Sequence, residues 1–438
     1  MTVALRRSFA SLSVPNYRRY FTGQVISISG NWMQIVAEMW LVVQLTGNGV
    51  SVGLTAALQF LPVLLFGAWG GVLADRMPKR RLLTFTQAAM AVPALTLWAL
   101  TIGGSVELWM VYSLVLARGV VTAIDNPARQ SFVSEIVGSD RVVNAVALNS
   151  LYVHTARIVG PAAAGGVIAL LGVGPCFLVN ALSFGAMLVA LRTMDPSQLQ
   201  PAPIVARARG QLRSALAYVR ATPDLWIPLA MMVAIGTFAY NFQVLLPLLA
   251  DFTWNGTATT YALLTSAMGI GSVAGALAQS ARGRVGPALL VGAAAARSSN
   301  APSAAAAPTL PLQIAALIPL GAATVTFSSS VNSSLQLAAV PEMRGRVMAL
   351  YAIVFIGSTP IGAPVAGWLS EVAGPRAGML LGAVVALAAA ATAAAGFARS
   401  RRRAAAEEAR TAPRRRGERR PGAPAPRARP EADRARAG

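Results

Sequence analysis

The chain has 438 residues, of which 55% are hydrophobic and 12% charged, and its mean hydropathy is +0.56. Soluble domains carry about a quarter charged residues, so this composition excludes an ordinary soluble protein and predicts an integral membrane protein. The net charge of +21 does not predict nucleic-acid binding, because 14 arginines and only five acidic residues lie in residues 398–438 and most of the remainder lies in short loops. A single cysteine and a single histidine provide no metal-ligand cluster.

Runs of about 20 mostly apolar residues, the length that crosses a bilayer, occur twelve times along the chain. The predicted transmembrane helices cover residues 21–46, 51–74, 82–102, 107–128, 143–171, 174–192, 225–250, 258–281, 285–306, 310–335, 346–370 and 374–398. Arginine and lysine gather before the first helix and in every second joint, whereas the opposite joints are nearly free of them. Because positively charged loops stay inside, this asymmetry predicts that both termini are cytoplasmic.

The two halves of the chain share landmarks at nearly constant separation. Gly-Val-Leu-Ala at 71–74 returns as Gly-Ala-Leu-Ala at 275–278, and Arg-Val at 141–142 returns at 346–347, which are offsets of 204 and 205 residues. Such agreement predicts two six-helix repeats. The predicted division of the chain is a first bundle at 1–192, a linker at 193–224, a second bundle at 225–398 and a tail at 399–438.

Two polar segments lie outside the predicted bundles. Within the cytoplasmic linker, Gln211–Arg220 is amphipathic and predicts a short helix that lies on the inner membrane face or is simply solvated. The cytoplasmic tail, residues 399–438, is rich in Arg, Pro and Ala with almost no aliphatic bulk, so it is predicted to be disordered. Its arginine clusters either contact anionic lipid headgroups or reflect composition alone.

In the first half, the ionisable residues that lie well inside predicted transmembrane helices are Glu38 in the first, Arg118 in the fourth, and His154 and Arg157 in the fifth. A charge within the bilayer is costly and usually has a function or a partner. His154 and Arg157 share a helix face, and Glu38 can neutralise either Arg118 or Arg157. The four residues are candidates for proton coupling; the alternatives are a structural ion pair and a buried, hydrogen-bonded histidine.

A charged loop joins the second and third predicted helices. It reads Gly71-Val72-Leu73-Ala74-Asp75-Arg76-Met77-Pro78-Lys79-Arg80-Arg81. Topology explains the basic residues but not the lone acid, Asp75. The loop resembles the signature between the second and third helices of the major facilitator superfamily. The resemblance implies that Asp75 faces the start of the eleventh helix and holds the outward-facing state. It also implies that Arg76 or Arg80 pairs with Asp125 at the inner end of the fourth helix, and these four residues form the predicted gate.

Further motifs resemble the enterobactin-exporter-like branch of this superfamily. They are Pro15-Asn16-Tyr17-Arg18-Arg19-Tyr20-Phe21, Asn31-Trp32-Met33-Gln34, Leu45-Thr46-Gly47, Asp125-Asn126-Pro127-Ala128-Arg129-Gln130 and Pro341-Glu342-Met343-Arg344-Gly345-Arg346. The resemblance implies an all-α integral membrane protein of twelve helices in the inner membrane of a bacterium. It implies proton-coupled efflux of a small amphipathic molecule, drug or siderophore-like, by alternating access of a monomer surrounded by lipid and without a cofactor.

The fifth predicted helix contains Gly160-Pro161-Ala162-Ala163-Ala164-Gly165-Gly166, which resembles the fifth-helix signature of the exporter branch with one extra alanine. Proline frees a backbone carbonyl, and glycine permits close approach of two helices. Gly160, Pro161, Gly165 and Gly166 are therefore predicted to form a hinge, with the three glycines against another helix. Plain helix packing without a hinge is the alternative.

Amides and aromatic residues mark the helices that surround a central cavity in this superfamily. The predicted lining consists of Asn31, Trp32, Gln34, Tyr240, Asn241, Gln243 and Asn332. It suits a bulky amphipathic substrate, although hydrogen bonds between helices would use the same residues. The ninth predicted helix is irregular, because Arg297-Ser298-Ser299-Asn300 lies at its middle. This helix is peripheral in the superfamily, so Arg297 is expected to face lipid at a cost of about 2.5–3.5 kcal/mol.

The sequence therefore predicts a secondary transporter. A Walker-type phosphate-binding loop and a cluster of catalytic acids, cysteines or histidines are absent from the sequence, so ATP-driven transport and an intramembrane enzyme are not supported. The irregular ninth helix alone favours a transport-inactive scaffold or degenerate paralogue. The sequence leaves siderophores, antibiotics and hydrophobic drugs open as substrates.

Overall fold

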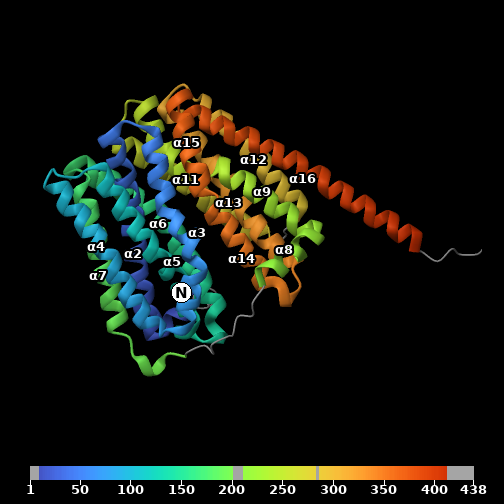
Figure 1. Cartoon of the computed structure of the whole chain (residues 1–438), viewed down its shortest axis with the longest axis horizontal. Coiled ribbons are helices and arrows are strands. Elements are labelled where there is room, and N and C mark those ends of the chain that lie inside the picture. Colours follow the sequence, from blue (N-terminus) through green and yellow to red (C-terminus); the bar gives the residue numbers. More distant parts are fainter. Residues whose placement is uncertain (1–8, 201–210, 283–285, 412–438) are drawn as a thin grey trace, which may run out of the picture. The chain divides into compact units, whose positions relative to one another are not determined.

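A computed structural model describes residues 9–200, 211–282 and 286–411 (Figure 1). Within these ranges the regular structure is helical, which confirms the all-α class. The helices are α2 Pro15–Thr46, α3 Gly49–Arg76, α4 Lys79–Ile102, α5 Leu108–Val137, α6 Val142–Leu171, α7 Gly174–Arg192, α8 Gln211–Ala221, α9 Pro223–Ala239, α10 Phe242–Leu248, α11 Ala258–Arg282, α12 Pro287–Ala306, α13 Leu310–Ala338, α14 Pro341–Gly357, α15 Thr359–Ala373 and α16 Pro375–Thr411. Short helical turns are η1 Ala10–Ser13, η2 Ser139–Arg141, η3 Pro196–Gln198 and η4 Leu249–Thr253.

Each predicted transmembrane segment is helical. The seventh is divided into α9, α10 and η4, and the eleventh into α14 and α15. In the described part of the chain, ten helical segments are long and apolar enough to cross a membrane. The first and ninth predicted segments, α2 and α12, are helical too and carry the buried polar residues Glu38 and Arg297.

Of the two polar segments outside the predicted bundles, the linker contains the predicted helix, whereas the start of the tail differs from the prediction. Helix α8 coincides with the predicted amphipathic helix of the linker. Helix α16 continues to Thr411, so residues 399–411 are helical where disorder was predicted. Alanine, arginine and glutamate are strong helix formers, which explains the extension. Residues 201–210 of the predicted linker and 412–438 of the predicted tail lie outside the described residues.

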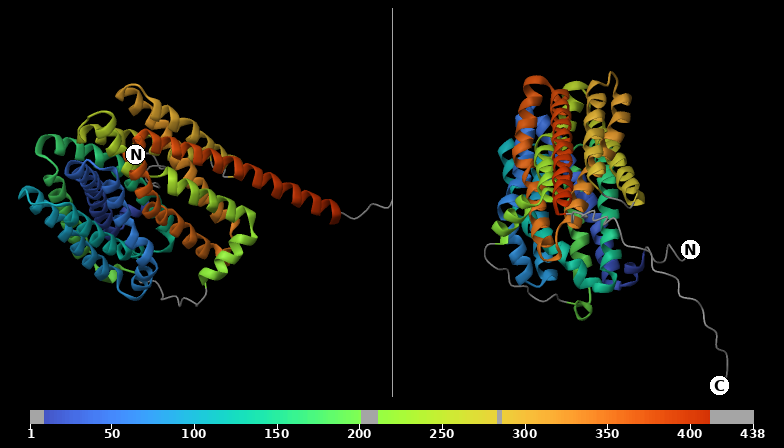
Figure 2. Two further views of the ribbon diagram at one scale, coloured as in Figure 1. Left: turned by 45° about the horizontal axis from the view of Figure 1, so that its top comes forward. Right: turned by 90° about the vertical axis from the view of Figure 1, so that its right-hand side faces the viewer.

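Residues Met1–Phe397 form one compact unit and Ala398–Gly438 a second. Within the first unit, we call α2–α7 the first half and the helices from α9 to Phe397 the second half. In Figure 1 and the left view of Figure 2, the blue-to-green helices of the first half gather on one side of this unit. The most extensive contacts between the halves join α3 to α15 and α6 to α11.

Glycines allow α3 and α15 to touch along their backbones. A Cβ atom on Gly53 would lie only 2.5 Å from the carbonyl oxygen of Ala363, so a larger residue does not fit there. At the start of α3, the Gly49 N–H donates to Oε2 of Glu371 at 2.5 Å. This contact lies at the end of the molecule that the charge pattern predicts to be outside.

Buried apolar residues join the halves at that same end. One cluster contains residues of both halves, including Trp40 and Tyr261, whose rings stack with centroids 6.4 Å apart. Toward the other end each half has its own cluster, around Phe132 in the first half and around Phe327 in the second. The described hydrophobic core is therefore shared at the predicted outer end and divided at the predicted inner end.

Candidate functional site: a cavity between the halves and a buried charge network

A cavity of about 300 Å³ lies between the two halves. Its walls come from α2 and α6 of the first half and, in the second half, from Tyr240 between α9 and α10 and from α10, α11, α13 and α14. This volume is at the lower end of the range of about 300–1,000 Å³ that is usual for small-molecule sites. The aromatic residues in its lining are Trp32, Tyr240, Phe242, Tyr261 and Phe355.

Three of the predicted lining residues line this cavity: Trp32, Tyr240 and Gln243. The Tyr240 hydroxyl donates to the carbonyl oxygen of Thr324 at 2.6 Å, which fixes its ring against α13. Gln243 donates from Nε2 to Oε1 of Gln59 at 2.8 Å and so connects α10 to α3 across the halves.

The four remaining predicted lining residues do not line the cavity. Their side chains form hydrogen bonds with neighbouring helices or with residues four positions away in the chain. Asn31 and Gln34 belong to a charge network described below. Asn241 donates to the carbonyl oxygen of Thr237 at 2.7 Å, and Asn332 accepts from Gln336 at 2.6 Å. The bonds of Asn31 and Gln34 join different helices, as the alternative predicted, whereas those of Asn241 and Asn332 are local and span four residues.

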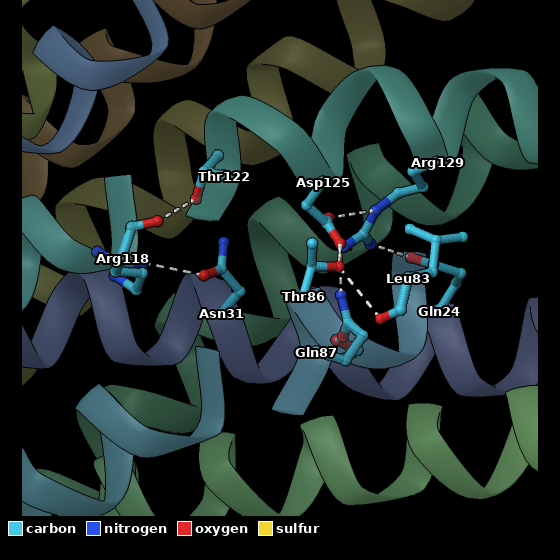
Figure 3. A network of polar contacts seen from close by, with 10 residues as sticks. Gln24, Asn31, Leu83, Thr86, Gln87, Arg118, Thr122, Asp125 and Arg129 are labelled. Atoms are coloured by element: carbon cyan, nitrogen blue, oxygen red, sulfur yellow. Dashed lines mark hydrogen bonds and ion pairs between the residues drawn. The ribbon is translucent and has the colours of Figure 1, made fainter. Parts of the chain in front are cut away.

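Glu38 is fully buried and forms an ion pair with Arg118. Nη2 of Arg118 donates to Oε2 of Glu38 at 2.5 Å, and Nε2 of Gln34 donates to Oε1 at 2.6 Å. Nη1 of Arg118 donates to Asn31 at 3.0 Å, as Figure 3 shows, and Asn180 donates to Gln34. Of the two partners that the sequence allowed for Glu38, the structure selects Arg118. Breaking such a buried pair costs about 3–5 kcal/mol.

A second network lies further along α5 and centres on Asp125 (Figure 3). Oδ1 of Asp125 accepts from Thr86 at 2.7 Å and from Gln87 at 2.9 Å, both on α4. Oδ2 accepts from Nε of Arg129 at 3.0 Å, and Arg129 also donates to Gln24 of α2. The network joins three helices of the first half near their predicted inner ends.

The predicted pairing of Asp125 with Arg76 or Arg80 is wrong for this structure. Arg129 lies one turn along the same helix and forms the ion pair with the Asp125 carboxylate instead. Arg80 donates to the last carbonyl groups of α7, at 2.7 Å and 3.0 Å, where the helix dipole favours a cation. Arg76 is exposed, and Asp75 is half-buried at the end of α3.

One ion pair was not found from the sequence. Nζ of Lys79 lies 2.6 Å from Oε1 of Glu135, and both side chains are buried. Lys79 was considered only as a loop charge. The available signal was an acid and a base at helix ends on the same predicted membrane face.

Arg157 on α6 is not part of the described Glu38 network. Arg157 lines the cavity, with its guanidinium carbon 5.1 Å from the centroid of the Trp32 ring. It forms no ion pair with any acid of the described residues. The backbone of His154 is helical, but its side chain lies outside the described part of the structure.

Helix α6 continues through Pro161, and its glycines face different surroundings. A Cβ on Gly160 would lie 2.5 Å from Cβ of Trp32 on α2, and one on Gly165 would collide with Ala262 on α11. Gly166 is exposed, with nothing within 4 Å of its Cβ position, so the prediction that it packs against a helix is wrong. Successive helix residues are rotated by about 100°, and Gly165 and Gly166 therefore face different directions.

Arg297 does not face lipid. Its side chain is 2% exposed and donates to the carbonyl oxygens of Ala239 and, at 3.3 Å, Gly382. Helix α9 ends at Ala239, so this carbonyl lacks the partner that a continuing helix would give it. The guanidinium also lies over the rings of Tyr240 and Phe242, with its carbon 5.8 Å and 5.5 Å from their centroids.

The contact of Gly165 gives a prediction with a matched control. Gly165→Leu should wedge α6 away from α11, because overpacking of this kind costs about 1–3 kcal/mol. A cysteine introduced at Ala258, which is 2% exposed at the start of α11, should then be labelled faster by a thiol reagent. Gly166→Leu should leave the labelling unchanged, since its Cβ position is open. Equal labelling in the two variants would contradict the packing argument.

The sequence matches the family described as transmembrane secretion effector over residues 6–417. The chain belongs to this family. It is 26% identical to the enterobactin exporter EntS of Salmonella typhi over 83% of this chain and 87% of that protein. It is 24% identical to the staphyloferrin A transporter of Staphylococcus aureus over 58% of this chain and 64% of that protein, which is less than two-thirds of its length.

A solved structure supports the fold. The nucleoside transporter NupG superposes with a TM-score of 0.70 at 14% identity, covering 87% of this chain and 99% of the other. The chain thus has the major facilitator fold that the sequence motifs predicted, and it belongs to a family of transmembrane secretion effectors.

Proposed function

We propose that this transporter exports a small amphipathic molecule by alternating access of two six-helix bundles, and that proton uptake drives the export. The distribution of the hydrophobic core carries the proposal. The halves share a cluster at the predicted outer end and have separate clusters at the predicted inner end, with the cavity between them. This is the arrangement of an inward-facing state in which one bundle rocks against the other.

The buried pair of Glu38 and Arg118 supports protons as the coupling ion. A carboxylate that exchanges its arginine contact for a proton changes the charge of the network on α2, α5 and α7. Such a change biases the packing of these helices and so favours one orientation of the first half. In the inward-facing state Glu38 is closed off, and the proton reaches it when the halves rearrange.

The substrate class rests on the relatives. Two of them are named for siderophores, enterobactin and staphyloferrin A, and a siderophore-like or drug-like molecule is the proposed cargo. The protein works as a monomer in the inner membrane of a bacterium, with both termini in the cytoplasm. The alternative of a transport-inactive paralogue rested on the irregular ninth predicted helix; the buried position of Arg297 in that helix supports the transporter instead.

Transport in proteoliposomes tests the function. Candidate cargo is first identified by comparing the culture media of cells with and without the gene. The purified protein should then move that compound against its gradient when a pH gradient is imposed, and a protonophore should stop the movement. Absence of any compound whose movement depends on both the protein and the pH gradient would contradict the proposal.

Asp75→Asn tests the predicted gate. A carboxylate facing the N-terminus of another helix contributes about 0.3–1 kcal/mol, so loss of the proposed contact between Asp75 and the start of the eleventh predicted helix should slow export about two- to fivefold without lowering membrane abundance. Glu107→Gln is the control, because Glu107 is an exposed acid at the opposite, predicted outer end. Equal export rates for wild-type protein and Asp75→Asn would remove Asp75 from the gate.

A further inference from the structure

The cavity between the halves contains a cation without a balancing anion. Arg157 is in its lining, and the described residues that form the walls include no Asp or Glu. The acid that the sequence offered as a partner, Glu38, is bonded to Arg118 and Gln34. Nothing in the described cavity wall therefore neutralises the guanidinium of Arg157.

The surroundings of Arg157 leave hydrogen-bonding capacity unused. Its Nε is buried without a partner, and its guanidinium carbon lies 5.1 Å from the centroid of the Trp32 ring. A cation over an aromatic ring is attracted to it but keeps its full charge. A partly desolvated guanidinium in this position gains most from an anion that accepts its N–H groups.

Four hydroxyl groups of the cavity wall are already engaged as hydrogen-bond donors. Thr265, Ser272, Thr324 and Ser328 donate to carbonyl oxygens of their own helices, at distances of 2.7–3.1 Å. A hydroxyl that donates in this way presents its lone pairs to the cavity. Arg157 is the only cation in the described lining and so its strongest donor for an anion, and these four hydroxyl oxygens can accept from hydroxyl or amide groups elsewhere on the ligand.

Resting on the proposed export function, we infer that the substrate is an amphipathic organic anion whose negative group binds Arg157. Its apolar body lies between Trp32 and the aromatic residues of the second half, Tyr240 and Tyr261 among them. Because α6 and α2 belong to one half and the aromatic partners to the other, the anion connects the two halves when it is bound.

A charge series on one ring system tests the inference. The probes are 2-naphthoate, the neutral 2-naphthamide and the cationic 2-naphthylmethylammonium, and their binding to the full-length protein in lipid nanodiscs is measured by calorimetry. Naphthoate should bind about tenfold or more tightly than naphthamide, since a charge-assisted hydrogen bond provides at least that discrimination. The ammonium compound should bind most weakly.

Variants locate the effect. Arg157→Gln should weaken naphthoate binding by about tenfold and leave naphthamide binding unchanged, which also shows that the variant is folded. Arg157→Lys should keep part of the preference, because it retains the charge without the planar fork. Arg376→Gln is the matched control: Arg376 lies over Trp254 at 5.7 Å and donates to the Ala307 carbonyl, away from this cavity.

The results separate this inference from the proposed function. Equal affinity for naphthoate and naphthamide, no binding of naphthoate, or an unchanged preference in Arg157→Gln would overturn the inference. If the proteoliposomes still exported a neutral or cationic compound, the proposed function would stand while the inference fell. A preference for naphthoate that disappears in Arg157→Gln and persists in Arg376→Gln supports it.

Discussion

Replacement of Glu38 by glutamine should abolish uphill export driven by a pH gradient while leaving downhill exchange measurable. Glutamine keeps the shape of the side chain and its hydrogen bond with Gln34, but it cannot take up or release a proton. Export against a gradient then loses its driving force. The measurement compares pH-driven accumulation with exchange of labelled and unlabelled substrate in the same proteoliposomes.

Stability must be separated from coupling in this test. Glu38→Gln leaves Arg118 buried without its partner, which costs about 3–5 kcal/mol. The double variant Glu38→Gln with Arg118→Met removes both charges and should recover most of the thermal stability without recovering uphill export. Glu135→Gln breaks the other buried pair, with Lys79, and should leave coupling intact. Retained pH-driven accumulation in the double variant would leave Glu38 and Arg118 as a structural pair.

The sequence was sufficient to predict the helices because the bilayer imposes their length and composition locally. It misplaced ends at which polar residues are buried. Helix α2 begins at Pro15, before the predicted start at residue 21, because Asn16 donates to the Asp195 carbonyl at 2.9 Å and Tyr17 to the Ala145 carbonyl at 2.9 Å. Hydropathy counts such residues as solvent-exposed, whereas tertiary hydrogen bonds make them part of the fold.

The sequence predicted which residues of the candidate site carry buried charge, but not which residues they pair with. Intramembrane charge identified Glu38 and Arg118, since such residues are expected to be paired. Which arginine neutralises Glu38, and which cation meets Asp125, depends on distances between helices that no spacing along one helix specifies. The same limit explains Gly166, which differs from Gly165 only in the direction that its position faces.

The position of Arg297 differs most between the sequence prediction and the structure. The two positions predict opposite effects of Arg297→Leu on stability. If Arg297 faced lipid, Arg297→Leu would stabilise the protein by about 2.5–3.5 kcal/mol. In the structure its guanidinium instead bonds the carbonyl groups of Ala239 and Gly382, which leucine cannot do. The substitution leaves the Ala239 carbonyl at the end of α9 without a donor, at a cost of about 1–3 kcal/mol, and removes a second bond to the Gly382 carbonyl, which keeps its donor within α16.

Arg297→Leu should therefore lower the free energy of unfolding of the purified protein by about 1–3 kcal/mol, measured as a lower unfolding temperature. The stability of Arg297→Lys should lie between those of the wild-type protein and Arg297→Leu. An ammonium retains the charge but lacks the planar fork that bonds two carbonyls in different directions. Ser299→Leu is the control on the same helix, since Ser299 is exposed and a larger apolar side chain is accommodated there. Arg297→Leu should also weaken ligand binding, because Tyr240 and Phe242 lie under the guanidinium of Arg297 and line the cavity. A rise in the unfolding temperature of Arg297→Leu would mean that Arg297 faces lipid and destabilises the protein. Other contacts would then stabilise the junction between α9 and α10.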